Sequence, residues 1–411
     1  MRFLILTQYY PPEVAAPQVR LQAMAHELMR AGHEVEVVTA MPNHPTGRIF
    51  DGYRRRLSMT EVIDGVTVRR VWLYAATGAG AKRMMNYASF TVTSLWGLLT
   101  SKRPDVLFVE SPPLFLSLPA RLICLVWRRP FVFNVADLWP DSATSMGLLR
   151  DGLLLRVLNA FEGWAYRRAR WVNAVTEGVR DTLLGAKRVP AAKVTFLPNG
   201  VDIECFAPRP ADSEMRARFA PAGEPLIVYA GTIGYAHGLD VALDAMALVR
   251  PHHPAARLLV LGDGSERVRL EAKASAEGLA NVTFLDPVPP AVLARVYSVA
   301  TAGLSTLRDL PFFAGTRPSK IFPMMASGLP VLYSGQGEGE RIVSEHEAGI
   351  SVPAGDAAAL ATGIARLIED PDAARTLGRN GRSLVEREYS WATLVGAWLD
   401  QLALGGRATC P

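Results

Sequence analysis

Short apolar runs alternate with longer stretches of mixed character along the first half of the chain. The runs at 3–8, 34–39, 105–110 and 131–135 are rich in Leu, Ile, Val and Phe and have the length of strands. Residues 19–30 instead repeat their apolar positions at helical spacing. This order of strand, loop, helix and strand predicts a Rossmann-like α/β domain with a parallel sheet.

The second half repeats this pattern. Its apolar runs are expected to be strands of a second parallel sheet, because helical stretches alternate with them. These runs are 226–231, 257–264, 282–286, 302–307 and 330–334. Several prolines between positions 208 and 225 mark a linker and a loop that lead into this half. The final amphipathic stretch, 391–403, predicts a terminal helix.

Two helical stretches of the first half combine apolar and basic residues. Residues 82–103 predict an apolar helix of about 17 residues between two basic pairs, which is short for a membrane span. Residues 153–171 are amphipathic, with aromatic residues and a basic end. Helices of this kind suit the plane of a membrane interface. The alternative is an ordinary helix that packs on the sheet.

Length and composition favour a globular protein of two domains. The chain has 411 residues, of which 49% are hydrophobic and 20% charged. Its three cysteines lie far apart, so neither a disulfide framework nor a zinc site is expected, and a reduced cytoplasm fits best. The first residues run into a strand without the features of a signal peptide.

The net charge of +5 is distributed unevenly. Residues 1–198 hold 25 Lys and Arg against 15 Asp and Glu, whereas residues 199–411 hold 19 against 24. No nucleic-acid motif accompanies the basic half, so we expect no nucleic-acid partner. The excess of positive charge favours an anionic membrane surface or a phosphate-bearing acceptor. A solvated basic surface without a partner is the alternative.

The stretch 316–331 is the strongest candidate for a ligand site. It places two cations before a short apolar helix that Gly328 and Pro330 bring to an end. Arg317 and Lys320 therefore lie at or near the N-terminus of a helix, where backbone N–H groups and the helix dipole favour an anion. The alternative is a charged helix cap without a ligand.

Two glycine-rich turns in the second half follow predicted strands. Gly231, Thr232 and Gly234 belong to a GTIG turn between strand and helix, which can bring backbone N–H groups close to a phosphate. Gly262 and Gly264 belong to an LGDGSE turn after the next strand, which we expect to shape a nucleotide pocket. Flexible loops without a ligand are the alternative for the second turn.

Acidic and basic residues of the first half follow its strands, where α/β sheets bind ligands. Asp137 and Asp141 come after the strand at 131–135, and Glu110 ends the strand before it. Glu13 and Arg20 come after the first strand. We expect these residues to contact an acceptor or a donor sugar. The alternatives are surface ion pairs and, for Asp137, an aspartate that only orders its loop.

No metal site is expected. The seven histidines form no ligand pattern, and no DxD motif follows an apolar strand. We therefore expect neither a catalytic metal nor a cofactor.

Several of these motifs together resemble family 4 retaining glycosyltransferases of the GT-B fold. The likeness is closest to the O-antigen and capsule branch that includes N-acetyl-fucosaminyl-transferase-like enzymes. The motifs are QYYPPE at 8–13, DLWP at 137–140, NGVD at 199–202, GTIGYAHG at 231–238 and TRPSKIFPMMASGLPV at 316–331. The resemblance spans nearly the whole chain.

The resemblance implies two Rossmann-like domains that face each other across a cleft. Residues 1–198 would bind the acceptor and residues 199–388 the nucleotide sugar. Residues 389–411 would form a helix that crosses back to the first domain.

The implied reaction is transfer of a sugar, N-acetylated or deoxy, from a UDP-sugar to a lipid-linked or saccharide acceptor in surface polysaccharide biosynthesis. Retention would follow from attack on the face from which the diphosphate departs. The protein would be cytoplasmic and peripheral on the inner face of a bacterial cytoplasmic membrane, whose anionic surface would be a partner.

The implied roles extend to most of the residues singled out above. Catalytic roles fall on Asp137, Lys320 and Arg317. Donor binding falls on Gly231, Thr232, Gly234, Gly262, Gly264, Thr316, Ser319 and Pro323. Acceptor binding falls on Glu13, Arg20, Glu110 and Asp141.

The chain departs from the family pattern at three positions. The paired glutamates of the family correspond to Gly315 and Pro323, and a histidine common in the family corresponds to Ala136. Many members also have an arginine and a lysine in the turn that matches 231–238, and this chain has neither. These departures leave two alternatives: a GT-B protein that binds partners without turnover, and a sugar-nucleotide epimerase.

Proline at position 323 also bears on the local backbone. It lacks an N–H and disfavours helical angles at the residue before it. We therefore expect the helix to begin near Pro323, with Ile321 and Phe322 outside it, or to kink there.

Overall fold

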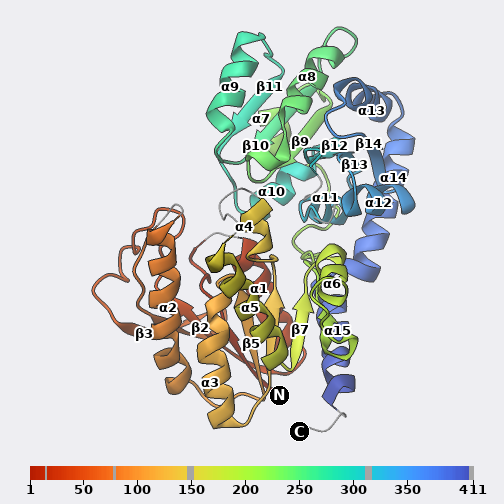
Figure 1. Ribbon diagram of the computed structural model, residues 1–411. Coiled ribbons are helices and arrows are strands. Elements are labelled where there is room, and N and C mark those ends of the chain that lie inside the picture. Colours follow the sequence, from red (N-terminus) through yellow and green to blue (C-terminus); the bar gives the residue numbers. More distant parts are fainter. Residues whose placement is uncertain (14–15, 77–79, 146–151, 311–316, 407–411) are drawn as a thin grey trace. The chain divides into compact units, whose positions relative to one another are not determined.

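The structure is a computed structural model that describes residues 1–13, 16–76, 80–145, 152–310 and 317–406. The chain folds into two compact units, each with its own hydrophobic core. Unit 1 comprises Met1–Asn199 together with the C-terminal residues from Leu394, and unit 2 comprises Gly200–Thr393. The predicted α/β class with two parallel sheets is confirmed (Figure 1).

Unit 1 is built on an eight-stranded sheet in the order β3-β4-β2-β1-β5-β6-β7-β8. All neighbouring strands are parallel except the hairpin of β3 and β4. The strands are β1 Arg2–Leu6, β2 Glu34–Ala40, β3 Ser58–Ile63, β4 Val66–Val71, β5 Val106–Ser111, β6 Phe131–Val135, β7 Trp171–Ala174 and β8 Val194–Phe196. The central strands are buried because helices cover them, which explains their continuous apolar runs.

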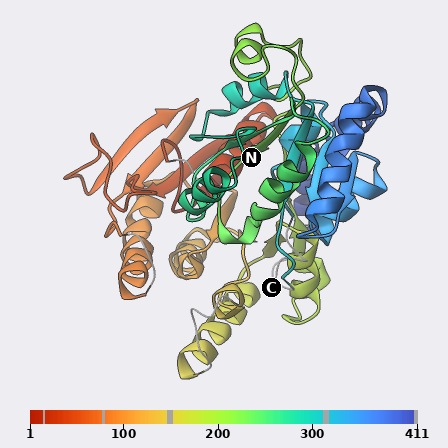
Figure 2. The same ribbon diagram turned by 90° about the horizontal axis from the view of Figure 1, so that it is seen from above.

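Three helices of unit 1, namely α2, α3 and α5, lie side by side in a row (Figures 1 and 2). The helices of the unit are α1 Ala16–Arg30, α2 Ala81–Thr100, α3 Ser117–Trp127, α4 Asp141–Ser145, α5 Leu153–Arg168 and α6 Glu177–Leu184, with single turns η1 Leu114–Leu116 and η2 Ala191–Lys193. The two amphipathic stretches noted in the sequence thus form α2 and α5. Phe90 and Leu98 of α2 are buried against the core of the unit.

The last helix, α15 (Trp391–Gly406), supplies a large side chain to the core of unit 1. The ring of Trp398 is completely buried and lies 6.1 Å from the ring of Phe3 and 5.7 Å from that of Phe108. Gln401 accepts a hydrogen bond from the backbone N–H of Phe196 at 2.8 Å. The end of the chain is therefore an integral part of this unit.

Unit 2 contains a six-stranded sheet, entirely parallel, in the order β11-β10-β9-β12-β13-β14. The strands are β9 Leu226–Ala230, β10 Arg257–Leu261, β11 Val282–Leu285, β12 Ala302–Thr306, β13 Val331–Ser334 and β14 Gly349–Val352. The first five correspond to the predicted runs. The sequence analysis did not identify β14, because this four-residue edge strand begins with glycine and is only partly buried.

The helices of unit 2 alternate with its strands, as the pattern predicted. They are α7 Ser213–Phe219, α8 Asp240–Val249, α9 Arg267–Ala276, α10 Pro290–Tyr297, α11 Ile321–Ala326, α12 Glu338–Glu345, α13 Ala357–Glu369 and α14 Pro371–Leu384, with a single turn η3 Tyr235–His237 and a π-helical turn Val385–Tyr389. The carboxyl ends of the parallel strands point to one edge of the sheet, where the candidate donor residues lie.

Helix α11 begins before its proline. Ile321 and Phe322 are helical, so the expectation that the helix begins near Pro323 is wrong. Pro323 is the third residue of the helix, where a backbone N–H would have no intrahelical acceptor, and the missing donor therefore costs little. At the other end Gly328 has a φ of 75° and donates to the Met325 carbonyl, which confirms the predicted left-handed cap.

Candidate functional site

The turns that follow β9 and β10 in unit 2 are interlocked. Gly231 donates its N–H to the Leu261 carbonyl at 2.9 Å. A Cβ on Gly262 would lie 1.9 Å from the Gly231 carbonyl oxygen, and a Cβ on Gly264 would lie 2.3 Å from the Ile233 carbonyl oxygen. Glycine is required at both positions because two backbones meet there. These glycines fix the shape of the sheet edge at which a donor is expected.

Lys320 lies directly beside this edge, as the residue that precedes α11. A Cβ on Gly231 would lie 3.3 Å from Lys320 Cε. The Lys320 amine donates to the Tyr229 hydroxyl at 2.6 Å and lies 4.3 Å from the centre of that ring. No carboxylate among the described residues forms an ion pair with this amine, and burial lowers its pKa to about 7. Two motifs 86 residues apart thus meet around a half-buried amine that no described carboxylate balances.

His237 belongs to the same cluster, although the sequence analysis did not propose it. Its Nδ1 lies 3.3 Å from the Lys320 amine, and a Cβ on Gly234 would lie 4.0 Å from its Cδ2. Thr306 donates to the backbone carbonyl of His237 at 2.6 Å, which holds the turn in place. Burial and the Lys320 charge lower the pKa of His237 to about 4. The available signal was its position three residues after Gly234, inside a motif already assigned to the donor.

Arg317 has a different environment from Lys320. Its guanidinium forms a buried ion pair with Glu338, in which Nε donates to Oε1 at 2.6 Å. The guanidinium also lies 5.4 Å from the centre of the Tyr389 ring. The charge of Arg317 is therefore balanced within unit 2, and its catalytic role stays a prediction.

The remaining predicted donor residues lie around Lys320 and the first turn. Thr232 and Ser319 are exposed, and Pro323 is half-buried on α11. Thr316 and Gly315 lie outside the described residues.

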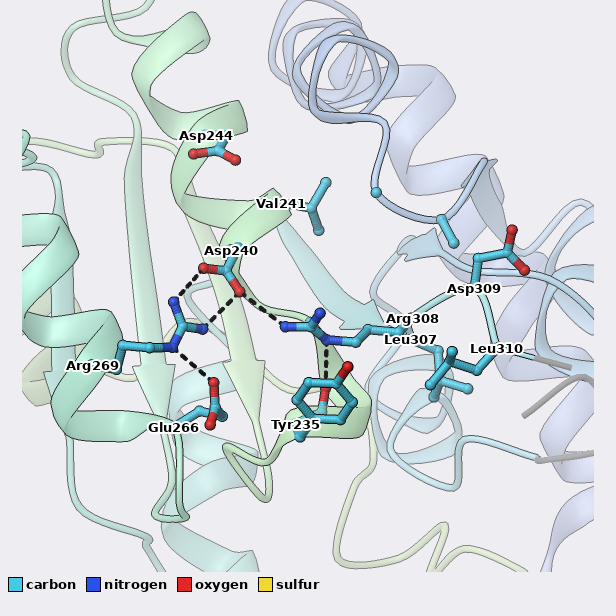
Figure 3. A pocket seen from close by; sticks show the side chains of 13 residues that line it. Tyr235, Asp240, Val241, Asp244, Glu266, Arg269, Leu307, Arg308, Asp309 and Leu310 are labelled. Atoms are coloured by element: carbon cyan, nitrogen blue, oxygen red, sulfur yellow. Dashed lines mark hydrogen bonds and ion pairs between the residues drawn. The ribbon is translucent and has the colours of Figure 1, made fainter. Parts of the chain in front are cut away.

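A polar hollow of about 800 Å³ adjoins this cluster (Figure 3). It is lined by the loops after β9, β12 and β14 and by the first turns of α8 and α9. Arg269 bridges Asp240 and Glu266, and Arg308 contacts Asp240 and the backbone carbonyl of Tyr235. These cations are bound to neighbouring groups of the protein, so the hollow offers polar contacts beside η3 rather than an unbalanced charge.

Glu13 in unit 1 is a buried carboxyl group with one free oxygen. Its Oε1 accepts hydrogen bonds from the backbone N–H groups of Asn43 at 2.8 Å and His44 at 2.9 Å. Its Oε2 is buried without a hydrogen-bond partner. Because the residue is 1% exposed, burial raises the pKa of its carboxyl to about 7. A buried oxygen without a hydrogen bond is unfavourable, so we expect a ligand to donate a hydrogen bond to it.

Glu110 and Arg20 form the end of a buried polar ladder across four strands. Glu110, Asn134, Asn173 and Thr195 are register partners on β5, β6, β7 and β8. Thr195 donates to Asn173 at 2.9 Å, Asn173 to Asn134 at 2.7 Å, and Asn134 to Glu110 at 2.7 Å. Glu110 also forms a buried ion pair with Arg20. Every link donates toward Glu110. Burial raises the pKa of its carboxyl, and the Arg20 charge and the hydrogen bond from Asn134 partly oppose this shift.

The two aspartates of the DLWP segment lie near each other with different partners. Asp137 accepts from the Ser142 hydroxyl at 2.7 Å, and burial raises the pKa of its carboxyl. Asp141 pairs with Lys187 at 2.8 Å, and Lys187 also pairs with the buried Glu162 at 2.7 Å. Asp137 is therefore the less constrained carboxyl group of the two.

The described ranges contain neither a metal-binding cluster nor a membrane-spanning helix. No cluster of three or more His, Cys, Asp or Glu side chains in them could hold a metal ion. Within the same ranges, no helix combines the length and apolar character that crossing a membrane requires.

Each half of the chain matches a family model. Residues 16–200 match the glycosyl transferase 4-like domain, and residues 211–384 match the glycosyl transferases group 1 domain. The two matches meet near the boundary of the two units.

Individual relatives are consistent with these matches. WcaI of Escherichia coli, named as a colanic acid biosynthesis glycosyl transferase, is 27% identical over 69% of this chain and 71% of its own length. The 2-deoxystreptamine N-acetyl-D-glucosaminyltransferase of Streptomyces fradiae is 27% identical over 94% of this chain and 95% of its own. The crystal structure of Anabaena Alr3699/HepE in complex with UDP-glucose has a TM-score of 0.71 and 17% identity, and the match covers 98% of this chain and all of that one.

Proposed function

The chain belongs to the family 4 glycosyltransferases of the GT-B fold, and on this basis we propose that it is a retaining enzyme of surface polysaccharide assembly. The proposed reaction transfers a sugar from a UDP-sugar to a lipid-linked or saccharide acceptor. Unit 2 would bind the donor and unit 1 the acceptor.

One observation carries the donor part of this proposal. The Lys320 amine is half-buried against the Gly231 turn, and no carboxylate of the described residues balances its charge. A partly desolvated amine of this kind is stabilised by an anion that enters from solvent. The diphosphate of a nucleotide sugar supplies such an anion, and the backbone N–H groups of the GTIG turn would add uncharged donors.

The same cation favours the chemical step. Cleavage of the anomeric bond leaves an additional negative charge on the departing diphosphate, and Lys320 would stabilise that charge more strongly in the transition state than in the bound donor. The departing phosphate oxygen would accept the proton of the attacking hydroxyl on the same face, which retains the configuration. Asp137 would orient the acceptor hydroxyl or the donor sugar. No step in this scheme uses a metal ion.

The nucleotide and the sugar are inferred from relatives. The structurally similar Anabaena protein was crystallised with UDP-glucose, which favours a uridine nucleotide here. The Streptomyces relative is named as an N-acetylglucosaminyltransferase, which favours an N-acetylated sugar. Glu13, whose Oε2 lacks a partner among the described residues, would contact the acceptor. Acceptor contacts by Arg20 and Glu110 stay a prediction, because these two buried side chains pair with each other.

We also propose that unit 1 docks on an anionic membrane surface through the outer face of α2, α3 and α5. The exposed apolar side chains of these helices include Val92 and Trp96 on α2, Leu122 and Val126 on α3, and Leu153 and Leu154 on α5, each between 55% and 79% exposed. Neither α2 nor α3 contains an acidic residue, and the one in α5, Glu162, is buried. Exposed apolar residues on helices with basic and no exposed acidic residues suit a lipid interface.

Flotation with liposomes tests this docking. The protein should float with vesicles that contain anionic lipid and less with neutral ones, and salt should weaken the binding, since charges are screened over about 8 Å at physiological ionic strength. Trp96→Ser together with Val126→Ser should reduce binding. Val268→Ser on the exposed face of α9 is the matched control. Equal recovery with neutral and anionic vesicles would contradict the proposal.

The reaction itself is tested by a panel of nucleotides and nucleotide sugars. Thermal shift should identify a uridine nucleotide as a stabilising ligand, because a ligand that binds the folded state raises its melting temperature. Donor hydrolysis or transfer above background, with release of the nucleoside diphosphate, would exclude a binding protein without turnover. Conversion of the nucleotide sugar to an isomer without release of diphosphate would instead indicate an epimerase.

A further inference from the structure

Two basic side chains from different elements flank the GTIG turn. Lys320, at the start of α11, lies against Gly231, and His237, in η3, lies against Gly234. Their nitrogens approach to 3.3 Å. The turn that would contact a diphosphate therefore has a basic nitrogen at each of its two glycines.

When Lys320 is protonated, as in the occupied site, its contact with His237 determines which nitrogen of the imidazole carries the proton. A protonated amine has hydrogens to donate and no lone pair to offer, so it must donate to His237 Nδ1. A neutral imidazole that accepts at Nδ1 carries its hydrogen on Nε2. No described residue accepts a hydrogen bond from His237 Nε2. The ring edge beside Gly234 thus presents an N–H donor that remains available.

The charged groups around the Lys320 amine do not neutralise it. Tyr229 on β9 and His237 in η3 are its direct polar contacts. Arg308, after β12, pairs with Asp240, and Arg317 pairs with Glu338. The stretch 311–316, which lies outside the described residues, contains no acidic residue in its sequence. Within the described part of the chain no acidic side chain pairs with this amine, so its charged form is stabilised by an anion that enters the site.

We propose that His237 binds the donor diphosphate through its Nε2–H, and that Lys320 takes up a proton from solvent when that diphosphate binds. The inference rests on the proposed function. His237 would contact the diphosphate in place of the arginine and lysine that this chain lacks in the turn at 231–238. The free site avoids a permanently buried charge, and the occupied site gains a cation and a neutral donor.

Calorimetry with UDP at pH 8 tests the proton uptake. The UDP phosphates are fully ionised at this pH, since the second pKa of a phosphate monoester is about 6. Binding enthalpies measured in buffers of different ionisation enthalpy should show uptake of nearly one proton, because Lys320 with a pKa of about 7 is mostly neutral before binding. Lys320→Arg, which is always charged, should bind UDP without this uptake. Binding by the unaltered protein without uptake would overturn the Lys320 part.

Substitutions of His237 test its hydrogen bond. His237→Leu should weaken UDP binding about tenfold, the value of one lost hydrogen bond to a charged group. His237→Gln retains an N–H donor near the Nε2 position and should recover most of the affinity. His252→Gln, at an exposed position of the same unit, is the control. Equal affinity of the Leu and unaltered proteins, each with a normal melting temperature, would overturn the His237 part.

The two levels of inference fail in different ways. If UDP binds but shows no proton uptake and no dependence on His237, the further inference is wrong and the proposed donor class stands. If UDP, GDP and ADP all fail to bind the folded protein, the proposed function is wrong and this inference falls with it.

Discussion

Glu13 in unit 1 and Lys320 in unit 2 are an acid and a base that are both removed from water, fully or in part, without a counter-charge among the described residues. Glu13 lies in the loop between β1 and α1, and Lys320 immediately precedes α11. Glu13 is buried and Lys320 half-buried, and neither forms an ion pair with another described residue. Burial raises the pKa of the acid and lowers the pKa of the base, so that both titrate near pH 7. Near neutral pH each therefore exists as a mixture of charged and neutral forms.

The buried arginines of the two units show the contrary arrangement. Arg20 is paired with Glu110 and Arg317 with Glu338. In each pair the two charges balance each other within the unit. Glu110 is also the end of the polar ladder, whose side chains are hydrogen-bonded to one another across four strands. The comparison teaches that burial alone does not identify a ligand site. A ligand is expected at the groups whose charge the fold leaves unbalanced.

The largest effect is expected from breaking a paired arginine. Arg317→Ala leaves the Glu338 carboxylate buried without its partner and should lower the free energy of unfolding by about 3–5 kcal/mol. Chemical denaturation measures it. Arg317→Met combined with Glu338→Leu removes both charges and should recover most of the loss. A stable Arg317→Ala protein that has lost only donor turnover would show that the arginine is catalytic, as the sequence suggested.

Lys320→Ala should have the next largest effect, and it should act on turnover. Loss of one group that stabilises developing charge lowers turnover by about 10²–10³-fold, with a smaller loss in donor affinity. Steady-state kinetics with the donor identified in the panel measures both. Unchanged turnover would remove Lys320 from the active site.

The unpaired lysine should also be a burden on stability. The folded pKa of about 7 lies below the unfolded value of about 10.4, so the unfolded state binds the proton more tightly. Lys320→Met should therefore raise the free energy of unfolding. The gain should have its full size below pH 7 and become smaller as the pH rises toward about 10.4. A loss of stability on this substitution would mean that the amine is balanced by a group of the protein.

Glu13→Gln is expected to stabilise the protein more strongly as the pH rises, whereas the gain from Lys320→Met decreases as the pH rises. The folded pKa of about 7 lies above the unfolded value of about 4.3, so the carboxyl costs stability as the pH rises through this window. The gain from Gln should reach up to about 4 kcal/mol above pH 7, at about 1.4 kcal/mol per pKa unit, and vanish near pH 4. Denaturation curves at several pH values measure it, and an equal gain at all pH values would exclude titration of Glu13 as the cause.

The smallest expected effect concerns the ribose contact in unit 2. Pro323→Glu should tighten UDP binding by about one to two decades, since a hydrogen bond to a charged group contributes about 1.5–3 kcal/mol. Pro323→Ala restores the backbone N–H without the carboxylate and serves as the control. Calorimetry on the pair distinguishes them. If Glu binds UDP no better than Ala, another residue already satisfies the ribose.

The sequence predicted the layout of the sheets better than their details. Continuous apolar runs identified the buried strands, because a strand covered on both faces is apolar at most of its positions. The edge strand β14 lacks this signal. The position of Pro323 was misjudged because the general cost of proline in a helix disappears in the first turn, and the sequence does not show where that turn begins.

The sequence predicted which residues belong to the candidate site, but not which of them contact or pair with each other. Lys320 and the glycines came from motifs, and the structure places Lys320 against Gly231. Arg317 and Lys320 looked equivalent in sequence, and only the position of Glu338, 21 residues after Arg317, separates them. His237 was missed because its importance arises from a contact with a residue 83 positions away.

The placement of Trp398 bears on how the chain folds as it is made. Synthesis proceeds from the N-terminus, and domains generally fold as units as they emerge. The first 199 residues of unit 1 leave the ribosome long before the tryptophan that lies against Phe3 and Phe108. Unit 2 can complete its own core during this delay. The part of the unit 1 core around Phe3 and Phe108 is therefore expected to close only after Trp398 has been synthesised, later than the core of unit 2.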